Sequence, residues 1–298
     1  MIRVYDAVTD QVVDSLDLSI PSGPTESRTY GPECDYTKVP YDYTRTVVPT
    51  NKDTRPGTPS GTAEPTPPVY QLTIIGGFTD AFHFYPVIVR DSIATIYLHN
   101  NMLEYGHTYY VTIDNGVLNL ADGSFQGVTK EDEWTFTTKS DMPELSDTLI
   151  VDATGKGDFN TVQGALDFIP DFNEQQTVIL VNPGDYEELV YTRNKWNVKI
   201  KGAGMADTKV HYANNEVFNP HPLTVKTNEW PGTFPSRRAA FMLDNCKDIV
   251  IEDMTIATDL KGQAEGLLIN GERIALYRVH IIGSGDALQA NGTIYMES

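Results

Sequence analysis

The chain has 298 residues, of which 40% are hydrophobic, and its formal net charge is −19. This length fits one large domain or two ordinary ones, and the hydrophobic content is sufficient for a packed core. A charge this negative disfavours nucleic acid as a partner, because phosphate binding needs a basic face. The longest apolar runs are too short to span a membrane, and the opening MIRVYDAVTD lacks the apolar stretch of a signal peptide.

The first 140 residues are predicted to form a small β-sandwich, interrupted by a segment rich in proline and threonine. Two short apolar runs, at residues 2–5 and 12–16, flank a polar turn and indicate two strands. Residues 21–68 contain few large aliphatic side chains and are typical of a linker or a long surface excursion. Alternating β-branched and aromatic runs then predict further strands, at residues 71–76, 93–98, 108–113 and 133–138. This part of the chain resembles the bacterial immunoglobulin-like modules that are appended to secreted enzymes.

A short polar linker leads to the second predicted domain, residues 147–298, which opens with an amphipathic helix. Four residues make the apolar face of this helix: Val162, Ala165, Leu166 and Ile169. Pro170 ends it, and Asp158 or Asn160 is the expected N-cap.

The rest of this domain contains a repeat of short apolar strands. Five residues recur with one constant shift of 25 residues: Leu243, Ile249, Ile251, Met254 and Ile256 recur as Leu268, Ile274, Leu276, Val279 and Ile281. Strands this short cannot bury an apolar face alone, so the repeat predicts an all-β solenoid in which each coil packs on the next. The end coil would expose its core, and the amphipathic helix is expected to cover it.

Six segments in a fixed order carry a resemblance to a known family: GKGDFNTVQGALDFIP, VILVNPGDYEELV, VKIKGAG, DMTI, GQAEGLLI and ALYRVHIIGSGDALQ. Together they resemble the pectin methylesterase (pectinesterase) family over residues 149–298. The resemblance implies a right-handed parallel β-helix, the pectin-lyase-like solenoid. It also implies removal of methyl esters from pectin (polygalacturonate, homogalacturonan) without a metal or other cofactor. A secreted, periplasmic or cell-surface location would follow.

The same resemblance implies two catalytic residues in this chain, Gln263 and Asp286. An ester hydrolase needs a nucleophile, a proton donor for the leaving alkoxide, and amide donors for the developing negative charge. Asp286 matches the family's general acid, and Gln263 matches its first glutamine, which donates to the tetrahedral intermediate. Without the resemblance, Asp286 would be interpreted as a turn residue, because Gly-Ser-Gly-Asp is favourable turn chemistry by itself.

Two departures from the family bear on activity. Gly285 stands where the family has a second glutamine, so a backbone N–H or Gln289 would have to replace that amide. The nucleophilic aspartate and the arginine of the family are expected after Ser298, so the chain is interpreted as truncated at both ends. We therefore expect little methanol release from these residues alone, unless a carboxylate such as Glu265 acts as nucleophile. The alternative function is a non-catalytic carbohydrate-binding or scaffold fragment.

The segment WPGTFPSRR lies where the family contacts its substrate. Thr233 or Ser236 matches the family's binding threonine, while Trp230 and Phe234 would stack on sugar rings. Arg238, or its neighbour Arg237, would meet a free galacturonate carboxylate. A solvated loop with one buried aromatic is the alternative interpretation. The six histidines show no metal-ligand spacing, and no Gly-x-Ser-x-Gly elbow is present.

Overall fold

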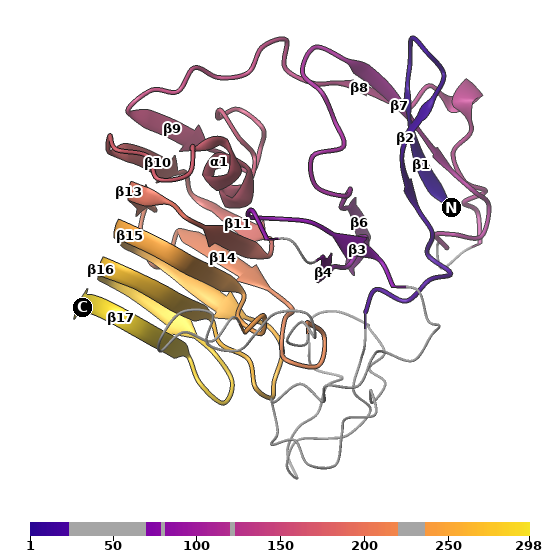
Figure 1. The fold of residues 1–298 in the computed structure, drawn as a ribbon. Helices are drawn as coiled ribbons and strands as arrows, with labels where there is room; N and C mark the ends of the chain where they lie inside the picture. Colours follow the sequence, from indigo (N-terminus) through magenta and orange to yellow (C-terminus); the bar gives the residue numbers. More distant parts are fainter. Residues whose placement is uncertain (24–69, 79–80, 120–122, 220–235) are drawn as a thin grey trace. The chain divides into compact units, whose positions relative to one another are not determined.

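The computed structural model describes residues 1–23, 70–78, 81–119, 123–219 and 236–298 (Figure 1). They separate into two compact units. The first unit includes Met1–Gly23 and Phe82–Glu144, and the second includes Ile74–Ala81 and Leu145–Ser298. The chain therefore enters the second unit briefly, returns to the first, and then enters the second again.

The first unit is built on an antiparallel sheet with the strand order β2–β1–β7–β8. Its strands are β1 (Ile2–Asp6), β2 (Val12–Leu16), β7 (Thr108–Ile113) and β8 (Thr135–Thr137). Two antiparallel pairs accompany it: β3 (Leu72–Thr73) with β4 (Phe82–His83), and β5 (Val87–Arg90) with β6 (Ile93–Ile96). A 3₁₀ turn, η2 (Lys130–Asp132), precedes β8. The buried centre of the first unit is formed by Ile2, Val4, Leu16 and Tyr109. The immunoglobulin-like topology stays a prediction.

The expected strand at 71–76 is much shorter in the structure. Only Leu72–Thr73 forms a strand, and Ile74–Ala81 clusters with the second unit. Phe78 is buried there against Tyr191, with the ring centroids 5.9 Å apart, and the Arg193 guanidinium lies 4.2 Å from the Phe78 ring centroid. Gly76 has φ +64°, and a Cβ on it would lie 1.7 Å from the Tyr191 carbonyl oxygen. Only glycine allows the two backbones to approach this closely.

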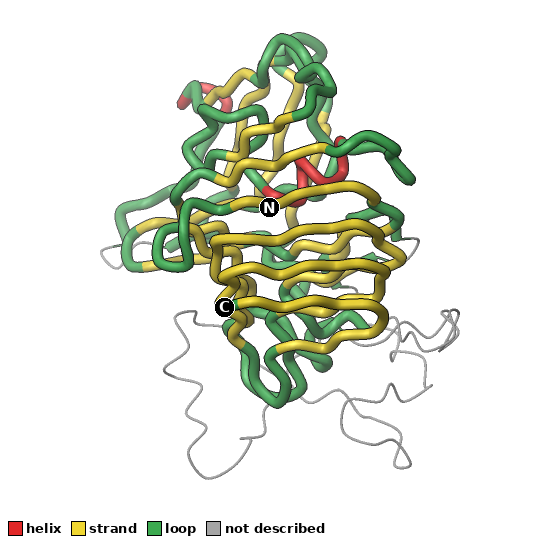
Figure 2. Tube along the Cα trace, turned by 90° about the vertical axis from the view of Figure 1, so that its left-hand side faces the viewer, coloured by secondary structure: helices red, strands yellow, loops and turns green. Residues whose placement is uncertain are grey.

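The second unit is a parallel β-helix, as predicted. Its strands are β9 (Thr148–Val151), β10 (Thr177–Val181), β11 (Gly184–Glu187), β12 (Val190–Arg193), β13 (Trp196–Lys201), β14 (Thr208–Tyr212), β15 (Phe241–Thr258), β16 (Leu267–Ile282) and β17 (Leu288–Glu297). These strands pair in parallel, and β12, β13 and β14 each pair with a different part of the long strand β15. Figure 2 shows them as stacked rungs.

The spacing between paired residues varies from coil to coil. It is 25 residues where Asp248 meets Arg273, but 51 where Arg193 meets Asp244, because the segment between β14 and β15 lengthens that coil. The predicted repeat is confirmed for Ile251, which pairs with Leu276. It is wrong by one residue at Leu243, which pairs with Ile269 instead of Leu268. The cause is an irregularity beside Asn245, whose φ is +50°.

The helix α1 (Val162–Phe168) contacts β9, β10 and β12 at the start of the stack. Its N-cap is Thr161, whose side chain accepts a hydrogen bond from the Gly164 N–H. The predicted N-caps, Asp158 and Asn160, were therefore wrong. Asp158 accepts a hydrogen bond from the Ile150 N–H at 2.8 Å instead. The helix ends at Phe168, before Pro170, as expected.

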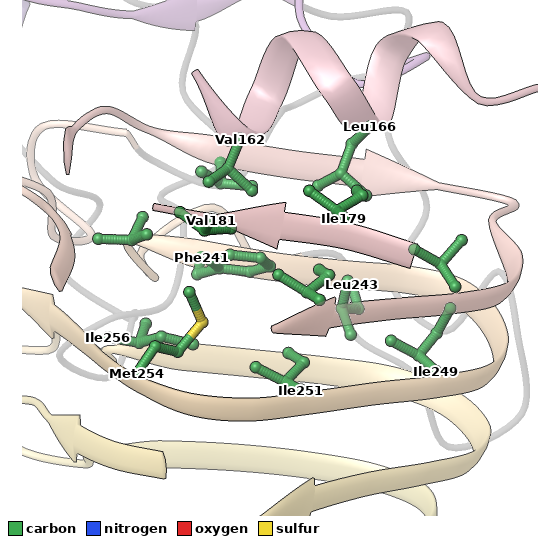
Figure 3. Close-up of a cluster of buried hydrophobic side chains, with 14 of the residues drawn as sticks. Val162, Leu166, Ile179, Val181, Phe241, Leu243, Ile249, Ile251, Met254 and Ile256 are labelled. Carbon is green, nitrogen blue, oxygen red and sulfur yellow. The ribbon is translucent and has the colours of Figure 1, made fainter. Parts of the chain in front are cut away.

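The interior of the coils is apolar and continuous from the helix to the last strand. Val162 and Leu166 of α1 lie over Ile179 and Val181, and residues of β15 such as Ile251 follow below them (Figure 3). Burial of this stack is the main source of stability, because each coil covers the apolar side chains of the coil before it.

Candidate active site

Two successive turns of the β-helix carry the candidate catalytic residues. The first turn joins β15 to β16 and holds Gln263 and Glu265, and the second joins β16 to β17 and holds Asp286. Leu267 and Leu288 are paired in register on the strands that follow. Because Glu265 and Asp286 each lie two residues before these leucines, they occupy equivalent positions in adjacent coils.

Backbone hydrogen bonds tie the two turns together. Ala264 N–H donates to the Ser284 carbonyl at 2.9 Å, and Ser284 N–H donates to the Ala264 carbonyl at 2.8 Å. Gly266 N–H donates to the Ala287 carbonyl at 3.0 Å. These bonds fix the turn of Gln263 and Glu265 relative to the turn of Asp286.

Gly285 has a structural reason to replace the glutamine of the family. Its φ is +86°, and a Cβ built on it would lie 2.9 Å from the Gly262 carbonyl oxygen. A side chain at this position would strain the turn and press against the preceding coil. Gln289, the alternative amide, lies half-buried on β17, and its Oε1 accepts a hydrogen bond from Arg238 Nη2 at 3.3 Å.

Glu265 is fully buried and forms an ion pair with Arg238, with 2.5 Å between Arg238 Nε and Glu265 Oε1. Burial raises the pKa of Glu265, the Arg238 charge opposes this, and the charge of Asp286 adds to the rise. Asp286 itself is exposed. The site therefore combines one solvent-accessible carboxylate with a second carboxylate that is held in an apolar, arginine-paired position.

Sequence reasoning did not identify Glu265 as part of a carboxylate pair. The signal was present, because GQAEGLL and GSGDALQ align residue for residue, with Glu265 opposite Asp286. The alignment has a spacing of 21 residues, which Asn270 and Asn291 share, and it therefore does not appear in the repeat of 25 residues.

The predicted substrate-binding residues have different outcomes. Ser236 is buried and Arg238 is mostly buried, with 18% of its side chain exposed. Trp230, Thr233 and Phe234 lie outside the described residues. Gln263 is half-buried, and its backbone carbonyl accepts a hydrogen bond from the Glu216 N–H at 3.0 Å.

Comparison with known proteins finds similarity between the second unit and pectinesterases. The family model for pectinesterases matches residues 148–295. Pectinesterase QRT1 of Arabidopsis thaliana is 30% identical over 155 residues, 49% of this chain and 40% of that protein. Probable pectinesterase 67 of the same plant is 33% identical over 96 residues, 30% of this chain and 28% of that protein. The chain thus spans less than half the length of these relatives.

Among solved structures, a pectin methylesterase from carrot is similar, with 20% identity and a TM-score of 0.42. The similarity covers 53% of this chain and 46% of the carrot chain. Pectin methylesterase PemA from Erwinia chrysanthemi is 19% identical with a TM-score of 0.37, covering 50% of this chain and 45% of that chain.

Proposed function

We propose, from the match of the pectinesterase family model to residues 148–295, that the chain takes part in hydrolysis of the methyl esters of pectin. The products are methanol and a free carboxylate on the galacturonate unit. The observation that carries the proposal is the position of Asp286, an exposed carboxylate in a turn fixed against the turn of Gln263.

In this proposal Asp286 is the general acid and base. It accepts a proton from a water molecule as that water attacks the ester carbonyl carbon and forms the tetrahedral intermediate, and it returns this proton to the methoxide as the ester C–O bond breaks. Gln263 donates its side-chain amide to the oxyanion of the tetrahedral intermediate. Glu265 is too deeply buried to attack an ester, so we assign it a different role: its ion pair holds the Arg238 side chain in place.

Arg238 is the proposed contact for the free carboxylates of the polymer. A guanidinium has five N–H donors, and the described contacts of Arg238 use those on Nε and Nη2. The exposed remainder of the side chain is available to a galacturonate carboxylate, which arginine recognises well. A local cation of this kind matters in a chain with a net charge of −19, because pectin is itself an anion.

A substrate in plant cell walls implies action outside the producing cell. Within the described ranges, no helix has both the length and the apolar character needed to cross a membrane. We propose a secreted, periplasmic or cell-surface location, and fractionation of cells that express the natural gene tests it.

The activity test is methanol release from methylated pectin by the chain and by Asp286→Asn. General acid–base catalysis contributes about 10²–10⁴-fold, so we expect slow release above the buffer rate that falls by about 100-fold in the variant. Asp248→Asn is the control, because Asp248 is a carboxylate paired with Arg273 on the outside of the coils. Release that is equal in the chain and in Asp286→Asn would contradict the role of Asp286. Pectin binding with no release above buffer would contradict the esterase proposal.

A further inference from the structure

A second cluster of ionisable side chains lies on the β-helix, built from three successive coils. Glu187 is the last residue of β11, His211 lies on β14, and Asp259 directly follows β15. Glu187 and His211 are paired in register. One ligand atom from each of the three residues lies within 4.8 Å of the other two.

His211 is the centre of this cluster and is 1% exposed. Its Nδ1 lies 2.5 Å from Asp259 Oδ2, and its Nε2 lies 3.0 Å from Asp185 Oδ1. Three carboxylates thus surround one imidazole, and the Lys209 ammonium lies 4.0 Å from the outermost of them, Asp185. This is an excess of negative charge around a nearly inaccessible ring.

We propose that Glu187, His211 and Asp259 bind a divalent transition-metal ion of the zinc class. Imidazole with carboxylates is a donor set that suits Zn²⁺. Ligands at about 2.0–2.2 Å from tetrahedral Zn²⁺ lie about 3.3–3.6 Å apart, so the most distant of these atoms would close by about 1.2–1.5 Å when the ion binds. Asp185, more than half exposed, lies at Nε2 of His211, on the other side of the ring from Asp259, where it would orient the imidazole as an outer-shell partner.

The proposed ligands are far apart in the sequence, so no short histidine motif indicates the site. The coil register, rather than a motif, brings Glu187 beside His211 and places Asp259 at the end of the next strand. An ion bound there links three coils and fixes the start of the turn that carries Gln263 and Glu265. The Asp259 N–H, which donates to the Tyr212 carbonyl at 3.0 Å, already ties that turn to β14.

The test is calorimetric titration of metal-free protein with ZnCl₂, together with thermal unfolding with and without the ion. We expect one Zn²⁺ per chain and a Tm that rises with Zn²⁺, because the ion binds the folded state. Glu187→Gln and Asp259→Asn should each weaken binding by about 100-fold or more, at least as much as loss of an outer-shell partner. These two variants retain His211, so the fold does not depend on replacing the most buried residue.

His280→Gln is the matched control, because His280 is an exposed histidine on β16. It should bind Zn²⁺ as the unmodified chain does. Absence of binding, or binding that Glu187→Gln and Asp259→Asn leave unchanged, would overturn the proposal. His211 would then serve only to link Asp185 and Asp259. Because every readout is binding or unfolding, the result is independent of esterase activity.

Discussion

At the scale of single residues, the Arg238–Glu265 pair differs from the other arginine–carboxylate pairs of the coils by its burial. Glu265→Gln would leave the Arg238 charge without its partner in a mostly buried position. Removing one member of a buried pair costs about 3–5 kcal/mol, so we expect a loss of this order in the free energy of unfolding, measured in urea.

The comparison variant for this prediction is Asp248→Asn, which breaks the outward-facing pair with Arg273. Exposed pairs contribute little to stability, so this variant should unfold almost as the unmodified chain does. Equal losses in the two variants would mean that the burial of Glu265 has no energetic consequence.

Gly285 gives a second prediction at this scale. Gly285→Gln would restore the amide of the family, but it forces a side chain onto a residue with φ +86° that faces the Gly262 carbonyl. Backbone strain of this kind costs about 1–3 kcal/mol, so thermal unfolding should occur at a lower temperature. Gly292→Gln, at the same kind of positive φ (+121°) on β17, serves as a second strained position for comparison. A variant at Gly285 that is as stable as the parent chain would contradict the strain.

At the scale of elements, the start of α1 depends on a buried carboxylate. Glu188 accepts hydrogen bonds from the Val162 and Gln163 N–H groups, at 2.7 and 2.9 Å. Burial raises the pKa of Glu188 from 4.5 to about 7, and these two hydrogen bonds limit the rise. The folded protein therefore keeps a proton that the unfolded chain loses between about pH 4.5 and pH 7.

The consequence is that the contribution of Glu188 to the free energy of unfolding decreases as the pH rises through this window. Glu188→Gln removes the titration, so the difference in unfolding free energy between pH 5 and pH 7.5 should be smaller in the variant. Glu272→Gln, at an exposed position on β16, should retain the dependence of the unmodified chain. A steeper pH dependence in Glu188→Gln would show that the sign is wrong.

The elements also show what the sequence could predict. The periodicity of β15 and β16 predicted parallel coils, because inward side chains of a solenoid must recur once per coil. The shift at Asn245 and the N-cap at Thr161 were not predicted, since each depends on a local backbone choice among several polar candidates. The pairing of Arg238 with Glu265 required the register between coils, which no single segment contains.

At the scale of the whole molecule, Ile74–Ala81 is a part of the second unit that comes from within the sequence of the first. Phe78→Ala would remove the ring that packs on Tyr191 and lies below Arg193. Loss of a buried phenylalanine ring costs about 3–5 kcal/mol, so we expect the second unit to unfold at lower urea concentration.

Phe172→Ala is the control for this prediction, because Phe172 is a phenylalanine of the second unit that is 46% exposed. It should change the urea midpoint less than Phe78→Ala does. An unchanged midpoint in Phe78→Ala would mean that the segment does not contribute to the stability of the β-helix.

The excursion of Ile74–Ala81 also constrains how such a protein can be inherited. Gene fusion and exon shuffling join domains at a single seam, and each partner then keeps all the residues that it needs. A breakpoint near residues 140–147 in this chain would produce a β-helix that lacks Gly76 and Phe78. The surface of Tyr191 that Phe78 covers would then be exposed. The two units are therefore expected to be inherited together. A lineage that separates them should carry compensating substitutions around Tyr191 and Arg193.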